Sequence, residues 1–291
     1  MAKGPILSIL IINYNTKKLT LECLESIYAF DTQQVEVLLL DNNSSDGSVS
    51  AIRKHFPKVR MFSKKQNLGF SKGNNFLLQQ AKGSYILFLN SDIKVLDNGI
   101  QKLLSCYQLN EKHVAFMGGK LFNVNMSSQP SCGPFYTLPV VFAALFLRGD
   151  YWGLTRRSPN RFNVVDWVSG ACIMTTKKVM NAVGGFDNTI FMYMEEIDLL
   201  YRARKQSFIT AFCPRAQFVH YGSASSHNGR TMPILNVFSG FIYFYSKHYS
   251  KIELLMLKGM LQLKAYIGYG IGTVTGNSYL KKTYGKARSI I

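Results

Sequence analysis

Several features are missing from this chain of 291 residues, and each absence excludes a class of protein. The five cysteines form no CxxC pair and lie apart from any cluster of histidines. This pattern argues against a zinc site or a disulfide framework and fits a reduced cytosolic setting. The N-terminus has no apolar signal-peptide core followed by a cleavage site, so we expect no secretory leader. No apolar run stays free of charge for long enough to predict a transmembrane helix.

Acidic residues are also scarce, with 16 Asp and Glu against 34 Lys and Arg, giving a net charge of +18 and a pI of about 9.7. An excess of this size predicts an anionic partner such as nucleic acid, an anionic membrane surface or a phosphate-bearing substrate. Nucleic-acid binders usually concentrate their charge in a basic arm or a recognition helix. The basic residues of this chain are scattered, so we expect no nucleic-acid partner.

The first third of the chain alternates apolar strand-like segments with helical ones. We expect strands at residues 7–12, 35–40, 59–63 and 85–89, and helices at 19–28, 48–55 and 74–81. This alternation predicts an α/β fold with a mostly parallel central sheet and helices on both faces. The length allows one large domain, or one domain with an appendage.

The middle of the chain is less regular. We expect a helix at 96–108, a strand at 114–121, another strand at 165–175, and a helix at 177–183 closed by Gly184 and Gly185. Residues 123–163 are rich in Ser, Pro, Gly and aromatics, which predicts a long loop with a short helix at 140–147. Loops of this length often form substrate lids or binding surfaces.

Beyond about residue 232, apolar and aromatic residues alternate with lysines. One interpretation is a basic amphipathic segment that lies in a membrane interface. The other is a pair of helices packed on the protein core, and composition alone leaves both open.

Polar residues follow two of the expected strands. Asp41 ends the second strand, where its carboxylate either accepts the imide N–H of uracil or thymine or caps the next helix, a role that Ser45 also fits. Asn90, Ser91 and Asp92 end the fourth strand, at the edge where open α/β sheets bind ligands. Asp92 suits a hard cation shared with a diphosphate.

A further group lies later in the chain. Glu195, Glu196 and Asp198 fall within one helical turn among apolar residues, a setting typical of metal binding or proton transfer. Their spacing places Glu195 and Asp198 on one face and Glu196 on another, so one acid can act as a base while another pairs with Arg202. An ordinary acidic helix start is the alternative.

Taken in order, these motifs resemble the family 2 glycosyltransferases with the GT-A fold, and most closely the rhamnosyltransferase-like members of bacterial cell-surface polysaccharide synthesis. The resemblance covers residues 6 to about 230, which implies a GT-A domain at 1–230 and a basic, aromatic helical extension at 231–291. It is carried by the sequences IINYN (11–15), LDNNSSDGS (40–48), NLGF (67–70), GN (73–74), LNSD (89–92), WVSGA (167–171), GGFD (184–187), MYMEEIDL (192–199) and His220.

The resemblance assigns roles to individual residues. It implies a divalent cation, Mg²⁺ or Mn²⁺, held by Asp92 and His220, and a general base that is Glu196 or Glu195. Glu196 stands where the family commonly has Asp, and Asn90 replaces the first aspartate of the DxD motif. It places the acceptor beside Trp167, Gly170, Ala171 and Asp198. It places the donor beside Asn13, Asn15, Asp41, Asn43, Asn67, Gly69, Asn74, Asn90, Ser91 and Asp92.

The implied reaction is the inverting transfer of a sugar from dTDP-L-rhamnose or a UDP-hexose to a hydroxyl of a polyprenyl-diphosphate-linked or polysaccharide acceptor. The enzyme would work as a peripheral protein on the inner face of the cell membrane, attracted to its anionic surface. A nucleotidyltransferase is less well supported, because it would need a glycine-rich basic loop after the first strand, where this chain has Asn13-Tyr14-Asn15-Thr16. A catalytically degenerate nucleotide-binding scaffold is the remaining alternative, supported by the departures at Asn90 and Glu196. The oligomeric state is left open.

Overall fold

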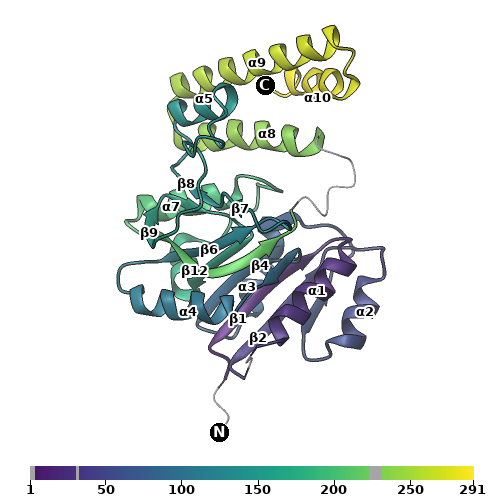
Figure 1. Cartoon of the computed structure of the whole chain (residues 1–291), viewed down its shortest axis with the longest axis vertical. Helices are drawn as coiled ribbons and strands as arrows, with labels where there is room; N and C mark the ends of the chain where they lie inside the picture. The colour runs from purple at the N-terminus through teal and green to yellow at the C-terminus, as the bar shows by residue number, and fades with distance from the viewer. Residues whose placement is uncertain (1–3, 31–32, 223–230) are drawn as a thin grey trace. The chain divides into compact units, whose positions relative to one another are not determined.

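The computed structural model describes residues 4–30, 33–222 and 231–291, which divide into two compact units (Figure 1). The first unit comprises Met1–Gly133, Arg157–Phe191 and Glu195–Ser225. The second comprises Pro134–Arg156, Met192–Met194 and Ser226–Ile291. The C-terminal extension therefore shares its unit with part of the long loop region, which the sequence alone assigned to the first domain.

The first unit is built on a ten-stranded sheet whose main path runs β3-β2-β1-β4-β11-β6-β12-β5. Its first four strands are all parallel, which confirms the expected α/β alternation. These strands are β1 (Leu7–Asn13), β2 (Val35–Asp41), β3 (Arg60–Ser63) and β4 (Tyr85–Asn90). The helices between them are α1 (Lys17–Tyr28), α2 (Ser48–His55) and α3 (Gly69–Gln80).

Beyond β4 the sheet is mixed. Strand β11 runs antiparallel to β4 and β6, whereas β12 runs parallel to β6 and antiparallel to β5. The elements are β5 (Ile93–Val95), α4 (Gly99–Asn110), β6 (Phe116–Phe122), β7 (Ser128–Gln129), β8 (Cys132–Gly133), β9 (Asn163–Val165), β10 (Trp167–Val168), β11 (Cys172–Thr176), α6 (Lys177–Val183), α7 (Glu195–Lys205) and β12 (Thr210–His220).

The sequence did not predict β5 or β12. The single strand expected at 165–175 is in fact interrupted, because β10 pairs with β8 outside the main sheet before β11 begins. The helix expected at 74–81 in fact begins at Gly69. A Cβ atom at Gly73 would lie 2.7 Å from Ile12 Cδ1, so this glycine allows α3 to pack closely on the sheet. Glycines in a helical segment lower its helix propensity, which explains why 69–73 was interpreted as a loop.

Alternate residues of β1 point to opposite faces of the sheet. Leu7, Ile9 and Ile11 join one buried cluster with apolar side chains of α1, α2 and α4. Burying these side chains stabilises the parallel strands and fixes where their carboxyl ends lie, since each fully buried aliphatic side chain contributes roughly 1.5–3 kcal/mol.

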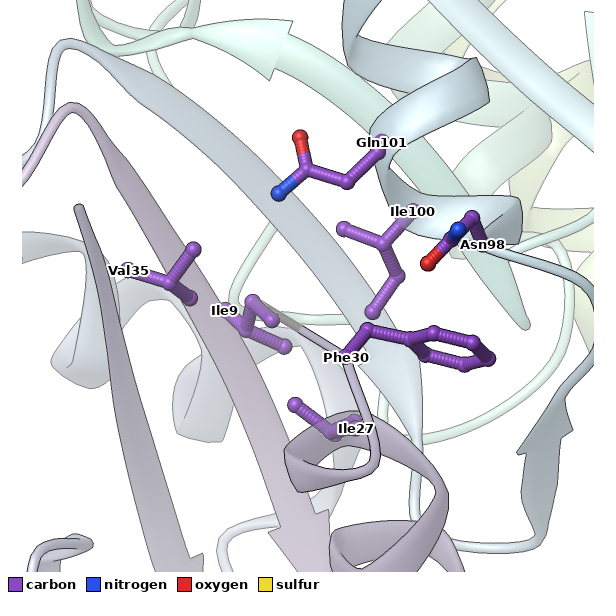
Figure 2. A pocket seen from close by; sticks show the side chains of 7 residues that line it. All are labelled: Ile9, Ile27, Phe30, Val35, Asn98, Ile100 and Gln101. Carbon is purple, nitrogen blue, oxygen red and sulfur yellow. The ribbon is translucent and has the colours of Figure 1, made fainter. Parts of the chain in front are cut away.

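A small pocket opens near the amino-terminal halves of β1 and β2 (Figure 2). It is lined by Ile9, Ile27, Phe30, Val35, Asn98, Ile100 and Gln101. Its lining is mainly aliphatic and carries no ionisable side chain. It also lies away from the carboxyl ends of the strands, where the polar residues gather, so we do not interpret it as the reaction site.

The second unit is helical. Its helices are α5 (Leu138–Phe146), α8 (Thr231–His248), α9 (Lys251–Val274) and α10 (Ser278–Arg288). Ser250 and Glu253 form a capping box that fixes the start of α9, and Lys264 Nζ donates to the backbone oxygen of Leu145 at 2.6 Å. No helix among residues 4–30, 33–222 and 231–291 is both long enough and apolar enough to span a bilayer.

Candidate active site

The carboxyl ends of three parallel strands meet at one edge of the first unit's sheet. Asn13 at the end of β1 pairs in register with Asp41 at the end of β2, and Ile12 pairs with Asn90 at the end of β4. The register therefore brings together polar residues that are far apart in the sequence. This is the edge at which open α/β sheets bind ligands.

Asp41 is held in a network of hydrogen bonds and is only 2% exposed. Asn13 Nδ2 donates to its Oδ1 at 2.7 Å, and the backbone N–H of Ser44 donates to its Oδ2 at 3.0 Å. The helix start that follows is served instead by Asp46, whose Oδ1 accepts from the backbone N–H of Ser48 at 3.0 Å. Neither Asp41 nor Ser45 therefore caps α2 in the structure.

The surrounding loops are held by amide side chains. Asn15 Oδ1 accepts from the backbone N–H of Ser45 at 2.8 Å, and both Asn15 and Asn43 have positive φ, of 52° and 71°. Asparagine tolerates this left-handed conformation better than most residues, because its short polar side chain forms local hydrogen bonds.

A second loop joins the same edge. Asn42 Nδ2 donates to the Gly69 oxygen at 3.2 Å, and Asn67 Oδ1 accepts from the Gly69 N–H at 2.9 Å. Gly69 has a φ of +73°, and a Cβ atom there would lie 2.6 Å from the Phe191 oxygen, so glycine is required. Asn74, one of the expected donor residues, is 2% exposed within α3.

Asp92 and His220 form the pair that the sequence singled out for a cation. They are brought together because β5 pairs antiparallel with β12, which places His220 opposite Ile93. His220 Nε2 lies 3.4 Å from Asp92 Oδ1, and both side chains are partly exposed. A carboxylate oxygen and an imidazole nitrogen are suitable ligands for Mn²⁺. The described residues contain no group of three or more His, Cys, Asp or Glu that could hold a metal ion, so substrate oxygens would have to complete the coordination.

Glu195 opens α7 and is buried, with 6% exposure. Its Oε2 has no hydrogen-bond partner among the described residues. Burial, and secondarily the nearby charge of Glu196, raises the pKa of the Glu195 carboxyl well above its usual value. Because Glu196 is more exposed than Glu195, it is the more accessible of the two carboxyls to an acceptor hydroxyl.

Glu196 lies on a different face of α7 and is only partly buried. A Cβ atom placed at Gly170 would lie 3.7 Å from Glu196 Cβ and Cδ and 3.6 Å from Phe70 Cζ. The adjacent residue, Ala171, accepts a hydrogen bond from the Asn90 N–H through its backbone oxygen at 3.0 Å. The Gly170–Ala171 segment therefore links the end of β4 to the Glu196 side chain.

All four expected acceptor residues are buried. Asp198 has no exposed surface and forms an ion pair with Arg202, from Nε to Oδ2 at 2.8 Å. Its carboxylate binds Arg202, as expected for one of the three acids, and its place beside an acceptor stays a prediction. Trp167 is 3% exposed in β10, so its side chain packs inside the unit.

Arg202 and Asn75 hold the segment before α7, and sequence reasoning gave Asn75 no role. Arg202 donates to the backbone oxygens of Val183 and Gly185 at 2.6 and 2.7 Å. Asn75 Nδ2 donates to the Phe186 oxygen at 2.8 Å, and its Oδ1 accepts from the Phe186 N–H at 2.9 Å. In the sequence, Asn75 is distinguished only by following Asn74 directly.

Comparison with known proteins decides the family. The family described as Glycosyl transferase family 2 matches residues 8–167, more than half of the chain. The chain belongs to glycosyltransferase family 2.

The rhamnosyltransferase-like character suggested by the motifs is supported by two relatives. The N-acetylglucosaminyl-diphospho-decaprenol L-rhamnosyltransferase of Mycobacterium tuberculosis is 25% identical over 241 residues, covering 76% of this chain and 78% of that protein. Rhamnosyltransferase WbbL of Escherichia coli is 25% identical over 232 residues, covering 77% and 85%.

Solved structures agree on the fold. The mannosyltransferase PcManGT of Pyrobaculum calidifontis, solved with GDP-Man and Mn²⁺, aligns with a TM-score of 0.59 at 14% identity, covering 99% of this chain and 87% of that one. S. aureus TarS aligns with a TM-score of 0.55 at 16% identity, covering 89% of this chain and 48% of that one. These similarities support the GT-A fold of this family 2 glycosyltransferase.

Proposed function

We propose that this glycosyltransferase transfers a sugar, with inversion, from a nucleoside-diphosphate donor to a hydroxyl of a lipid-linked or growing polysaccharide acceptor. The proposed donor is dTDP-L-rhamnose or a UDP-hexose. The names of the two rhamnosyltransferase relatives support the rhamnosyl donor, and the first of those names supports a polyprenyl-diphosphate-linked acceptor.

One observation carries the proposal. The Gly170–Ala171 segment accepts a hydrogen bond from Asn90, near Asp92, and lies beside the Glu196 side chain. The carboxylate that we propose to bind the cation and the partly exposed Glu196 are thereby placed beside one short stretch of backbone. Those are the two groups that a direct displacement at a sugar carbon requires.

Within this site, Glu196 accepts the proton of the acceptor hydroxyl as that oxygen attacks the anomeric carbon. Asp92 and His220 would hold the divalent cation, Mg²⁺ or Mn²⁺, which when bound neutralises charge on the departing diphosphate. Asp41 accepts from the imide N–H of uracil or thymine, because each of its oxygens takes one hydrogen bond in the structure and keeps a second lone pair. No covalent sugar–enzyme intermediate is needed.

The proposal is tested by calorimetric titration with UDP, dTDP and GDP, each with and without Mn²⁺, followed by turnover with the matching nucleotide sugars. We expect cation-dependent binding of UDP or dTDP, and a product whose anomeric configuration, read by NMR, is opposite to that of the donor. Nucleotide binding without turnover would favour the degenerate scaffold. Folded protein that binds no nucleotide would contradict both the transferase and the nucleotide-binding scaffold.

Replacing Asp92 by Asn should weaken cation-dependent nucleotide binding more than tenfold. Loss of even an outer partner of a ligand typically costs about 10–100-fold in metal affinity, and Asp92 is proposed to be a ligand itself. Asp97→Asn is the matched control, since that carboxylate is 78% exposed on the surface. Equal losses in the two variants, or none in Asp92→Asn, would argue against a cation at Asp92. Calorimetry with Mn²⁺ and the nucleotide selected above gives the measurement.

We further propose that the second unit binds an anionic membrane surface, where a lipid-linked acceptor would be found. Helix α9 buries Leu257, Leu261 and Ala265 on one face. Its other face carries an exposed apolar stripe at helical spacing, made of Ile252, Leu255, Met256, Leu263, Tyr266, Ile267, Ile271 and Val274. From residue 231 onward the chain has eight Lys and Arg against one Glu. Such an apolar stripe in a basic unit suits interfacial binding to anionic lipid.

Placing acidic groups on this stripe should release the protein from lipid. We expect Leu255→Glu combined with Met256→Glu to reduce co-sedimentation with vesicles of mixed anionic and zwitterionic lipid, because both side chains are more than half exposed. Leu109→Glu is the control, since Leu109 is 79% exposed on the first unit. Unchanged co-sedimentation of the double variant would show that α9 does not contact lipid.

A further inference from the structure

His220 makes a second contact that the proposed reaction does not use. Its Nε2 faces Asp92, whereas its Nδ1 lies 2.8 Å from Gln129 Oε1. Gln129 lies on β7, in the stretch that the sequence predicted to be a long loop. Strand β7 pairs with β6, and β6 in turn pairs with β12, which carries His220.

The orientation of the Gln129 amide is set by its other partners. Its Nε2 donates to Asn123 Oδ1 at 2.9 Å and to the backbone oxygen of His220 at 3.3 Å. Asn123 uses its own nitrogen to donate to Ser127 Oγ at 2.9 Å, which leaves Asn123 Oδ1 as an acceptor. Turning the Gln129 amide over would place its oxygen against the carbonyl oxygen of His220, and these two acceptors would repel each other.

The atom that faces His220 Nδ1 is therefore an oxygen, which can only accept. It follows that Nδ1 carries the proton in the neutral imidazole, and that Nε2 presents a bare lone pair. That lone pair points toward Asp92 Oδ1, another acceptor, at 3.4 Å. In this tautomer both atoms are acceptors, so a divalent cation could be bound by the two together.

We propose that Gln129 is a positioning residue for the cation site: it holds His220 in the Nδ1–H form, with Nε2 free to bind a divalent cation together with Asp92. The inference rests on the cation-dependent transferase proposed above. Outer hydrogen-bond partners of this kind fix the ring and the protonated nitrogen of a metal-binding histidine. Gln129 does this through β7, so a short strand far from the other site residues in the sequence helps to prepare the site.

The test uses the full chain and begins without metal. Long-range ¹H–¹⁵N spectra of the histidine side chains, assigned with His220→Asn, report which imidazole nitrogen carries the proton. We expect the Nδ1–H form in the wild type and in Gln129→Glu, because a carboxylate also accepts from Nδ1. In Gln129→Leu the acceptor is gone, and we expect the Nε2–H form, which donates to Asp92, to gain population.

Calorimetry with Mn²⁺ and UDP, dTDP or GDP gives the second readout. Gln129→Leu should lose about 10–100-fold in cation affinity, while Gln129→Glu should recover most of it. A merely structural role would lower both variants equally and leave the protonated nitrogen unchanged. Thermal unfolding of both variants separates these effects from loss of fold.

The two proposals fail in different ways. Wild-type protein that binds nucleotide without any dependence on Mn²⁺ would overturn the cation-dependent function, while the metal-free spectra would still decide the role of Gln129. A wild-type His220 that is protonated on Nε2 or on both nitrogens would overturn the role of Gln129. Cation affinity that is unchanged in Gln129→Leu would do the same.

Discussion

Replacing Glu196 by Gln is expected to lower kcat by about 10²–10⁴-fold, the range that a positioned general base contributes, while donor binding stays close to that of the wild type. The amide keeps the size of the side chain and its place beside Gly170 but cannot take the proton of the acceptor hydroxyl. Steady-state transfer and calorimetric donor binding, measured on the same preparation, separate the two effects. Normal transfer by this variant would move the base to another carboxyl.

Glu195→Gln is the matched control, one residue away on the same helix. It should lose far less kcat than Glu196→Gln, because the Glu195 carboxyl is buried and less accessible to an acceptor hydroxyl than that of Glu196. The reverse order of losses would identify Glu195 as the base.

Glu195→Gln should also change how the stability of the protein depends on pH. The folded state raises the pKa of Glu195, so its proton is bound more tightly in the folded than in the unfolded protein. This contribution to stability is fully present below the unfolded pKa and is lost as the pH rises through the folded pKa. Between those two values, stability should fall less steeply in Glu195→Gln than in the wild type, as measured by urea unfolding at a series of pH values.

Replacing Arg202 by Met is expected to lower the free energy of unfolding by about 3–5 kcal/mol, the usual cost of removing one partner of a buried ion pair. Asp198 has no exposed surface, and its buried charge would lose the ion pair with Arg202. The change also removes the donors to the Val183 and Gly185 oxygens, which hold the chain before α7. Chemical denaturation monitored by circular dichroism gives the measurement.

Arg204→Met is the control on the same helix, because Arg204 is exposed. It should change stability by no more than about 0.5 kcal/mol, as surface substitutions usually do. Adding Asp198→Leu to Arg202→Met should recover part of the lost free energy of unfolding, since the buried carboxylate is then removed as well. Similar losses for the two arginines would show that the ion pair contributes little.

The sequence predicted the parts of the fold that rest on local patterns. The apolar runs ending at Asn13, Asp41 and Asn90 predicted strands of a parallel sheet, because buried strands show continuous hydrophobicity and end in polar turns. The family resemblance then grouped their terminal residues with a more distant acidic cluster. Glu195, Glu196 and Asp198 were singled out together, but their separate environments could not be inferred, since burial depends on the packing of α7.

What the sequence could not predict depends on pairing between distant segments. Strand β12 contains Pro214 and Arg215 at an irregularity in its pairing with β6, so its hydrophobic alternation is interrupted. Gln129 gave no signal because a glutamine in a polar loop is ordinary. Its contact with His220 exists only once β7, β6 and β12 have paired.

The position of β12 also has a consequence for how the protein is made. This strand lies between β6 and β5, although both of them precede it in the chain. While the ribosome is still synthesising residues up to 209, β6 therefore has an unpaired edge and His220 does not yet exist. Long-range pairing of this kind folds slowly and leaves strand edges open to aggregation. The proposed cation site is thus completed by the last strand of the first unit among the described residues, so we expect a nascent chain to be inactive until β12 has paired with β6 and β5.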